Sequence, residues 1–147
     1  MKKLFTMFFA LSLVTLLACE KYGEDRPIDF RKLPDAAQTF INTNYPDVKV
    51  LYVTRDDDII RPDYTVRLAN GVEVQFSSNG SLENIESQNV EVPAGIVPVQ
   101  IVDYVKANYP DEKIVGYDVE RYTYEVKLTN RIDLKFNSSY TLIEIDD

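Results

Sequence analysis

The side chains able to do chemistry restrict the reactions that this 147-residue chain could carry out. It has no histidine and only one cysteine. A Ser-His-Asp relay, a Cys-His relay and a histidine-ligated zinc or copper site are therefore excluded. Carboxylates are plentiful, with 24 Asp and Glu against 16 Lys and Arg, and a pair of carboxylates can hydrolyse glycosides. Their spacing does not indicate such a pair, so we expect no enzyme, no catalytic residue and no cofactor.

The sequence feature closest to a metal site is the acidic run Asp56-Asp57-Asp58. An EF-hand loop places its calcium ligands at alternating positions and needs a glycine at its sharp turn. The run has consecutive aspartates and no such glycine. We therefore predict no metal site in this chain.

The single cysteine, Cys19, ends a segment with the features of an export signal. Lys2-Lys3 precede an apolar run, Leu4 to Leu17, which is shorter than the ~20 residues of a membrane span. The sequence Leu16-Leu17-Ala18-Cys19 is similar to the lipobox of bacterial lipoproteins, which are cut before the cysteine and acylated on it. Cys19 is thus the predicted lipidation site, and residues 1–18 are the predicted signal peptide. The alternative is an ordinary signal peptide followed by an incidental cysteine.

The net charge of −8 limits the kind of partner. Nucleic-acid binding depends largely on neutralising phosphates, so an acidic chain is not expected to bind nucleic acid. The same sign disfavours adhesion to an anionic membrane surface. We therefore expect membrane attachment through the N-terminal lipid alone, in the bacterial cell envelope, facing the periplasm or the cell surface.

The four residues Asn-Tyr-Pro-Asp occur twice, at 44–47 and at 108–111. Around these two copies the chain aligns with itself, first at an offset of 64 residues and later at an offset of 60. This predicts two tandem repeats that share one core and form one domain. The predicted segments are an N-terminal tether at 19–32, repeat 1 at 33–87, a linker at 88–96 and repeat 2 at 97–147.

Each repeat is predicted to be one helix followed by three or four antiparallel strands. Pro34 and Pro98 suit a first helical turn, and the later proline of each Asn-Tyr-Pro-Asp forbids further helix. We interpret this phrase as a helix stop that directs the chain into a strand, with its tyrosine packed beneath the junction. A paired ligand-binding motif is the alternative interpretation.

The predicted strands alternate apolar and polar residues. They lie near 48–55, 64–68, 72–76 and 82–86 in repeat 1, and near 113–120, 124–128 and 132–136 in repeat 2. Asn70-Gly71 and Asn79-Gly80 predict tight hairpin turns with positive φ. Repeat 2 has Asn130-Arg131 and Ser139-Tyr140 instead, so we expect looser or different turns there.

Two features are candidates for binding another protein. The polar face of the sheet is either an ordinary solvated face or a recognition surface. The loop at 56–63 is longer than its repeat 2 counterpart, and its two isoleucines either fold back onto the core or protrude as a contact. The candidate partner-binding residues are Asp56, Asp57, Asp58, Ile59, Ile60, Arg61, Arg67, Glu73, Glu125 and Lys127.

Together, the lipobox and the two helix-and-strand units, with Tyr45-Pro46, Tyr64–Leu68, Asn70-Gly71 and Phe76, resemble the PepSY-like, beta-lactamase-inhibitor-like family of bacterial periplasmic lipoproteins. The resemblance implies an α+β fold with helices packed on one face of an antiparallel sheet. The function that we expect is a lipid-anchored envelope binding module, such as an inhibitor or regulator of a peptidase or other hydrolase. The alternative function is a carrier of small molecules or peptide fragments, with a pocket between helices and sheet.

Overall fold

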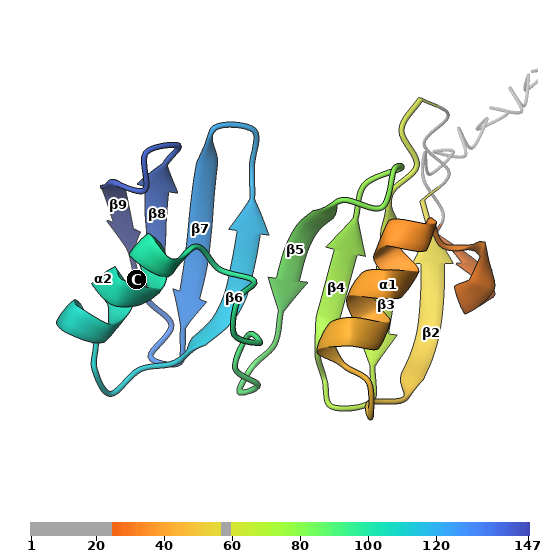
Figure 1. Ribbon diagram of the computed structural model, residues 1–147, viewed down its shortest axis with the longest axis horizontal. Helices are drawn as coiled ribbons and strands as arrows, with labels where there is room; N and C mark the ends of the chain where they lie inside the picture. Colours follow the sequence, from red (N-terminus) through yellow and green to blue (C-terminus); the bar gives the residue numbers. More distant parts are fainter. Residues whose placement is uncertain (1–24, 57–59) are drawn as a thin grey trace, which may run out of the picture.

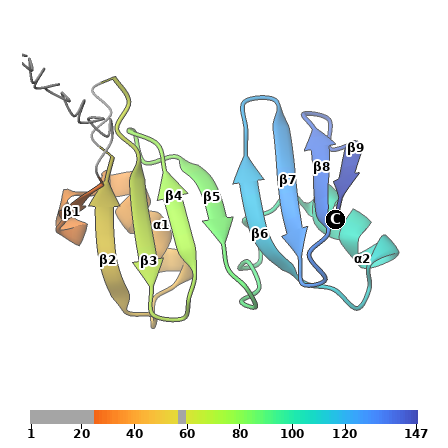
Figure 2. The same cartoon turned by 180° about the vertical axis from the view of Figure 1, so that it is seen from behind.

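The computed structural model describes residues 25–56 and 60–147. Their strands form one antiparallel sheet of nine strands, and each strand pairs with its neighbours in sequence, from β1 at one edge to β9 at the other. The two α-helices both lie on one face of this sheet (Figure 1), and the view from behind shows the strands of the other face uncovered (Figure 2). The predicted α+β fold with helices on one face is confirmed.

The elements follow the two repeats. Before the first repeat come β1 (Arg26–Ile28) and the short 3-10 helix η1 (Phe30–Lys32). Repeat 1 contains α1 (Asp35–Asn44), β2 (Val50–Arg55), β3 (Tyr64–Leu68), β4 (Glu73–Phe76) and β5 (Leu82–Glu86). Repeat 2 contains α2 (Val99–Asn108), β6 (Ile114–Val119), β7 (Thr123–Leu128), β8 (Asp133–Asn137) and β9 (Leu142–Asp146).

The strand β1 lies inside the segment that we expected to be only a tether. It pairs with β2 in an antiparallel register, with Ile28 opposite Val53. Residues Arg26–Ile28 give little strand signal because Pro27 lacks an N–H and the segment is only three residues long. The pairing is set by a distant strand, which local sequence does not reveal.

The Asn-Tyr-Pro-Asp phrases end the two helices as predicted. The Asn44 side-chain amide donates to the Phe40 carbonyl and that of Asn108 donates to the Tyr104 carbonyl, each at 2.9 Å. Each asparagine side chain thus folds back onto the last turn of its own helix and adds a second hydrogen bond to a carbonyl of that turn. Tyr45 is buried beneath the junction, and burial raises the pKa of its hydroxyl to about 12. The helices start one residue later than we expected, because Pro34 and Pro98 occupy the N-cap positions.

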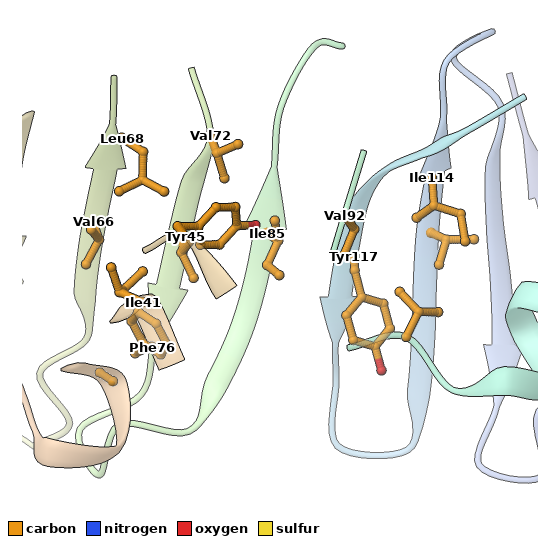
Figure 3. Close-up of a cluster of buried hydrophobic side chains, with 14 of the residues drawn as sticks. Ile41, Tyr45, Val66, Leu68, Val72, Phe76, Ile85, Val92, Ile114 and Tyr117 are labelled. Atoms are coloured by element: carbon orange, nitrogen blue, oxygen red, sulfur yellow. The ribbon is translucent and has the colours of Figure 1, made fainter. Parts of the chain in front are cut away.

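The core is built twice on the same plan. Phe76 and Phe136 are completely buried, and each packs edge-on against an aromatic ring from the helix of the same repeat. The ring centroids are 5.5 Å apart for Phe40 and Phe76 and 5.4 Å apart for Tyr104 and Phe136. The buried side chains of both repeats belong to one hydrophobic cluster, part of which is drawn in Figure 3.

The prediction of looser or different turns in repeat 2 is wrong. Arg131 and Tyr140 adopt positive φ values of 72° and 59°, beside 88° and 84° for Gly71 and Gly80. The closing hydrogen bonds are also reproduced: the Gly71 N–H donates to Leu68 at 3.1 Å, and the Arg131 N–H to Leu128 at 2.9 Å. Strand pairing on both sides of each turn fixes its geometry. Arg131 and Tyr140 therefore adopt the left-handed backbone conformation, although it is unfavourable for a residue with a side chain.

Candidate functional site

The uncovered face of the sheet, here called the open face, is made of two rows of side chains that cross eight strands. Side chains of directly paired residues share a face, so the strand register defines the rows. The first, the Arg67 row, contains Tyr52, Arg67, Glu73, Glu86, Gly116, Lys127, Asp133 and Asp146. The second, the Thr65 row, contains Thr54, Thr65, Gln75, Asn84, Asp118, Glu125, Lys135 and Glu144.

The two halves of the open face differ in chemistry. In the Thr65 row, repeat 1 supplies only neutral polar side chains, whereas repeat 2 supplies only charged ones. The residues at equivalent positions include Thr65 and Glu125, and Gln75 and Lys135. A partner lying along this row would therefore meet a neutral half and a charged half.

Ion pairs organise the charged positions. Arg67 lies 3.5 Å from Glu73, and Lys135 lies 3.3 Å from Glu120 and 3.8 Å from Glu125. Such exposed pairs contribute only ~0–1 kcal/mol each to folding. Their clearer effect is to fix where charge is presented to a partner.

The two repeats meet on the open face at Gly116. A Cβ atom added there would come within 2.9 Å of the Lys127 Cβ. The absence of a side chain lets Lys127 of β7 cross over β6 and reach Glu86 of β5, with an N–O distance of 3.3 Å. Beside it, the Asn84 amide donates to the Asp118 carboxylate at 3.1 Å. The equivalent position in repeat 1 is Tyr52, which is half exposed at 50 %, so the glycine belongs to the junction between the repeats.

The open face holds more negative charge than its ion pairs neutralise. Burial, followed by the nearby Asp133, raises the pKa of Glu125, while Lys135 acts against this. Burial also raises the pKa of Asp133, although Lys127 opposes it. One carboxylate oxygen of Asp133, Oδ1, is buried without a hydrogen-bond partner among the described residues. A cationic group from a partner would be favoured at this part of the face.

The longer loop of repeat 1 and the short turn of repeat 2 are closed by equivalent backbone hydrogen bonds. The Asp56 N–H donates to the Asp63 carbonyl at 3.0 Å, and the Glu120 N–H donates to the Thr123 carbonyl at 3.0 Å. Ile60 is 84 % exposed, so this isoleucine protrudes and does not fold back. Arg61 is also exposed. Asp57, Asp58 and Ile59 lie outside the described residues.

A second apolar side chain protrudes at the same end of the sheet. Tyr122, at the turn between β6 and β7, is 69 % exposed and lies beneath the Arg121 guanidinium, 5.4 Å from its ring centroid. Figure 1 shows this turn and the β2–β3 loop both at the top of the sheet. We call this end, with Ile60 and Tyr122, the rim. Sequence reasoning missed Tyr122, whose only signal is an aromatic residue at a hairpin tip.

The structure thus separates the predicted partner-binding residues into two groups. Arg67, Glu73, Glu125 and Lys127 lie together on the open face, whereas Asp56, Ile60 and Arg61 belong to the rim loop. Arg67 and Glu73 also line a groove of about 500 Å³ with Glu86 and residues 87–90. None of these groups forms a nucleophile and base pair.

Two further observations concern metal and membrane. Within residues 25–56 and 60–147, no group of three or more acidic or cysteine side chains is placed to hold a metal ion. Within the same residues, neither helix has the length and apolar character needed to cross a membrane.

The fold and the open face define a class of protein, a twin-repeat α+β module with one uncovered sheet face. The family described as beta-lactamase-inhibitor-like and PepSY-like matches residues 20–83 and again 62–144. The chain belongs to this PepSY-like family. No curated protein matches it.

Three solved structures of similar fold come from Bacteroides. One, a "putative calcium-regulated periplasmic protein" of Bacteroides thetaiotaomicron, is 37% identical with a TM-score of 0.80, covering 84% of this chain and 97% of its own. Another, a "putative periplasmic protein" of Bacteroides vulgatus, is 36% identical with a TM-score of 0.80, covering 84% and 98%. A third, from the same species and of unknown function, is 32% identical with a TM-score of 0.79, covering 84% and 100%. The structural relatives are thus periplasmic proteins.

Proposed function

We propose that this protein is a lipid-anchored, non-catalytic module that binds another protein of the cell envelope through its open face and rim. Its role is to inhibit or regulate that protein, such as a peptidase or another hydrolase. The observation that carries the proposal is the open face itself: two rows of mostly polar side chains, most of them partly buried, that no described element covers.

The open face is large enough for a specific interface. Eight strands spaced by ~4.8 Å span roughly 35 Å, and a standard interface buries ~800 Å² on each partner. The polar rows supply orientation and charge complementarity. Ile60 and Tyr122 at the rim and Tyr52 on the open face supply exposed apolar anchors, and such anchors often dominate binding energy.

The relatives support the location and the type of function. The matching family is described as beta-lactamase-inhibitor-like, and the structural relatives are periplasmic. The lipobox-like sequence before Cys19 supports anchoring of the module to a membrane. Calcium regulation is named for the Bacteroides thetaiotaomicron protein, and we do not extend it to this chain.

The carrier hypothesis has less support. It requires a tyrosine-lined pocket between helices and sheet. In each repeat, however, an aromatic pair packs between the helix and the sheet, and its phenylalanine, Phe76 or Phe136, is completely buried. A groove of about 590 Å³ lies instead between α2 and the linker, lined by apolar residues such as Val92, Val97 and Val102. Charged residues such as Glu91 and Lys106 also line it, and no tyrosine does.

The proposal is tested by capturing a partner from envelope extract with the chain from residue 20 onward, which retains every described residue. The matched baits are wild type, Ile60→Ser and Val99→Ser. Val99 is also exposed and apolar, at 63 %, but it lies on α2, on the covered side of the sheet. We expect wild type and Val99→Ser to capture the same envelope protein and Ile60→Ser to lose it.

Thermal melting of the same baits is the control for folding. Because Ile60 is exposed, Ile60→Ser should leave the melting temperature nearly unchanged. Equal capture by Ile60→Ser and wild type would remove the rim from the proposal. Loss of capture with Val99→Ser alone would move the contact to the helical side and contradict the open-face assignment.

A further inference from the structure

Two strand edges of the described sheet have no strand paired with them, the outer edge of β9 and the outer edge of β1. β1 is a poor acceptor of another strand, since it has three residues and Pro27 has no N–H to donate. β9 has five residues and contains no proline. Its backbone is therefore the better docking edge.

The internal repeat shows what such an edge binds. β5 is the repeat 1 equivalent of β9, and its outer edge is occupied by β6, with Ile85 opposite Tyr117. Ile85 is only 1 % exposed, whereas its equivalent, Ile145, is 53 % exposed. The difference arises because no described strand stands beside β9 as β6 stands beside β5.

The backbone shows the same difference. The Ser87 N–H, just after β5, donates to the Val115 carbonyl of β6 at 3.0 Å. The equivalent Asp147 N–H donates to the neighbouring Asp146 carboxylate at 3.1 Å. Backbone groups two residues apart point to the same edge of an antiparallel strand. The N–H and carbonyl of Ile145 therefore face outward along with the Asp147 N–H.

We propose that the outer edge of β9 binds an extended segment of a partner protein by antiparallel strand addition. The segment carries an apolar or aromatic residue opposite Ile145 and basic residues opposite Glu144 and Asp146. The aromatic position follows from Tyr117, which stands directly opposite Ile85 in repeat 1. The basic positions follow from charge, because Glu144 and Asp146 are exposed carboxylates at that edge.

The same charges argue against a second copy of this chain as the occupant. Two β9 strands paired antiparallel about Glu144 would place acidic side chains directly opposite each other, which is destabilising. The proposal goes beyond the proposed function, since it concerns the unpaired backbone edge of one strand, where Asp146 and Glu144 are the last residues of the two open-face rows.

A synthetic peptide based on the β6 sequence tests the inference. The probe has the sequence of residues 113–120 with Gly116→Lys and Asp118→Lys, which places lysines on both sides of the tyrosine. It is titrated at low ionic strength into the isotope-labelled chain from residue 20 onward. We expect saturable chemical-shift changes along β9 and at least tenfold slower hydrogen exchange of the Ile145 and Asp147 amides. Absence of binding, or protection located elsewhere, would overturn the proposal.

Two comparisons establish the cause of binding. E144K/D146K should weaken the probe at least tenfold, whereas D47K/D111K changes the net charge equally at exposed positions away from β9 and should have no effect. Equal weakening by both variants would reduce the interaction to net charge and refute the edge assignment. The unsubstituted peptide, which carries Asp118, should bind at least tenfold more weakly than the probe. The location of the exchange protection on the unaltered chain, at Ile145 and Asp147 or elsewhere, needs no protein variant and decides between edge pairing and net charge even if a variant fails to fold.

Discussion

Truncating either core phenylalanine should destabilise the whole protein and not only the repeat that contains it. Phe76 and Phe136 are both completely buried, and each packs edge-on against an aromatic ring of its own helix. Replacing such a ring by alanine costs ~3–5 kcal/mol, from lost transfer energy and the cavity left behind. For a domain of this size, that loss lowers the melting temperature by about 10–20 °C.

Scanning calorimetry of the chain from residue 20 onward tests this expectation. Wild type should show one transition with equal calorimetric and van't Hoff enthalpies. The reason is that pairing of β5 with β6 joins the two repeats in one sheet, and buried residues of both repeats form one cluster. Phe76→Ala and Phe136→Ala should each move that single transition. Two transitions, with each variant lowering only one of them, would show that the repeats fold independently and would refute the shared core.

Three further predictions concern a turn, a carboxylate and the anchor. Arg131→Gly should stabilise the fold by ~0.5–1 kcal/mol by relieving left-handed strain, whereas Gly71→Ala should cost ~1 kcal/mol; urea unfolding measures both, and the same sign for the two would contradict the strain argument. Because burial raises the pKa of Asp133, its ionised form destabilises the fold fully above that raised pKa, and this cost disappears below its ordinary value of 3.8. Asp133→Asn should therefore raise the melting temperature at pH 7 but not at pH ~3, and a pH-independent difference would exclude titration as the cause. Cys19→Ala should abolish fatty-acid labelling and membrane fractionation; unchanged labelling would refute lipidation at Cys19.

Much of the fold could be predicted from the sequence because its signals are local and occur twice. Alternation of apolar and polar residues placed β3 at Tyr64–Leu68, and the Asn-Tyr-Pro-Asp phrases placed the helix ends. β1 could not be predicted, since its three residues gain their conformation from pairing with β2. The turn at Arg131 was predicted wrongly because residue preference favours glycine there, while the hairpin register imposes the geometry regardless.

The candidate site was only partly predictable for a related reason. The same alternation assigned Arg67, Glu73, Glu125 and Lys127 to one face, and the register places them there. The junction at Gly116 was not predictable, because it depends on pairing between β5 and β6, and the internal repeat does not specify how its copies join. The exposure of Ile60 likewise required the loop backbone, since an apolar residue in a loop is compatible with burial or protrusion.

The way the sheet ends explains why the two copies differ where they do. A repeat whose last strand accepts the first strand of the next could continue indefinitely, and a heterologous contact of this kind produces filaments. At one edge, β1 covers β2 with a short strand whose Pro27 cannot donate to a further one. At the other, the positions of Asn84 and Glu86 become Glu144 and Asp146, so the outermost strand is fully acidic on the open face. Proline at one edge and two carboxylates at the other oppose addition of another copy of this acidic chain. Carboxylates, unlike proline, leave the backbone of β9 able to pair with a basic strand.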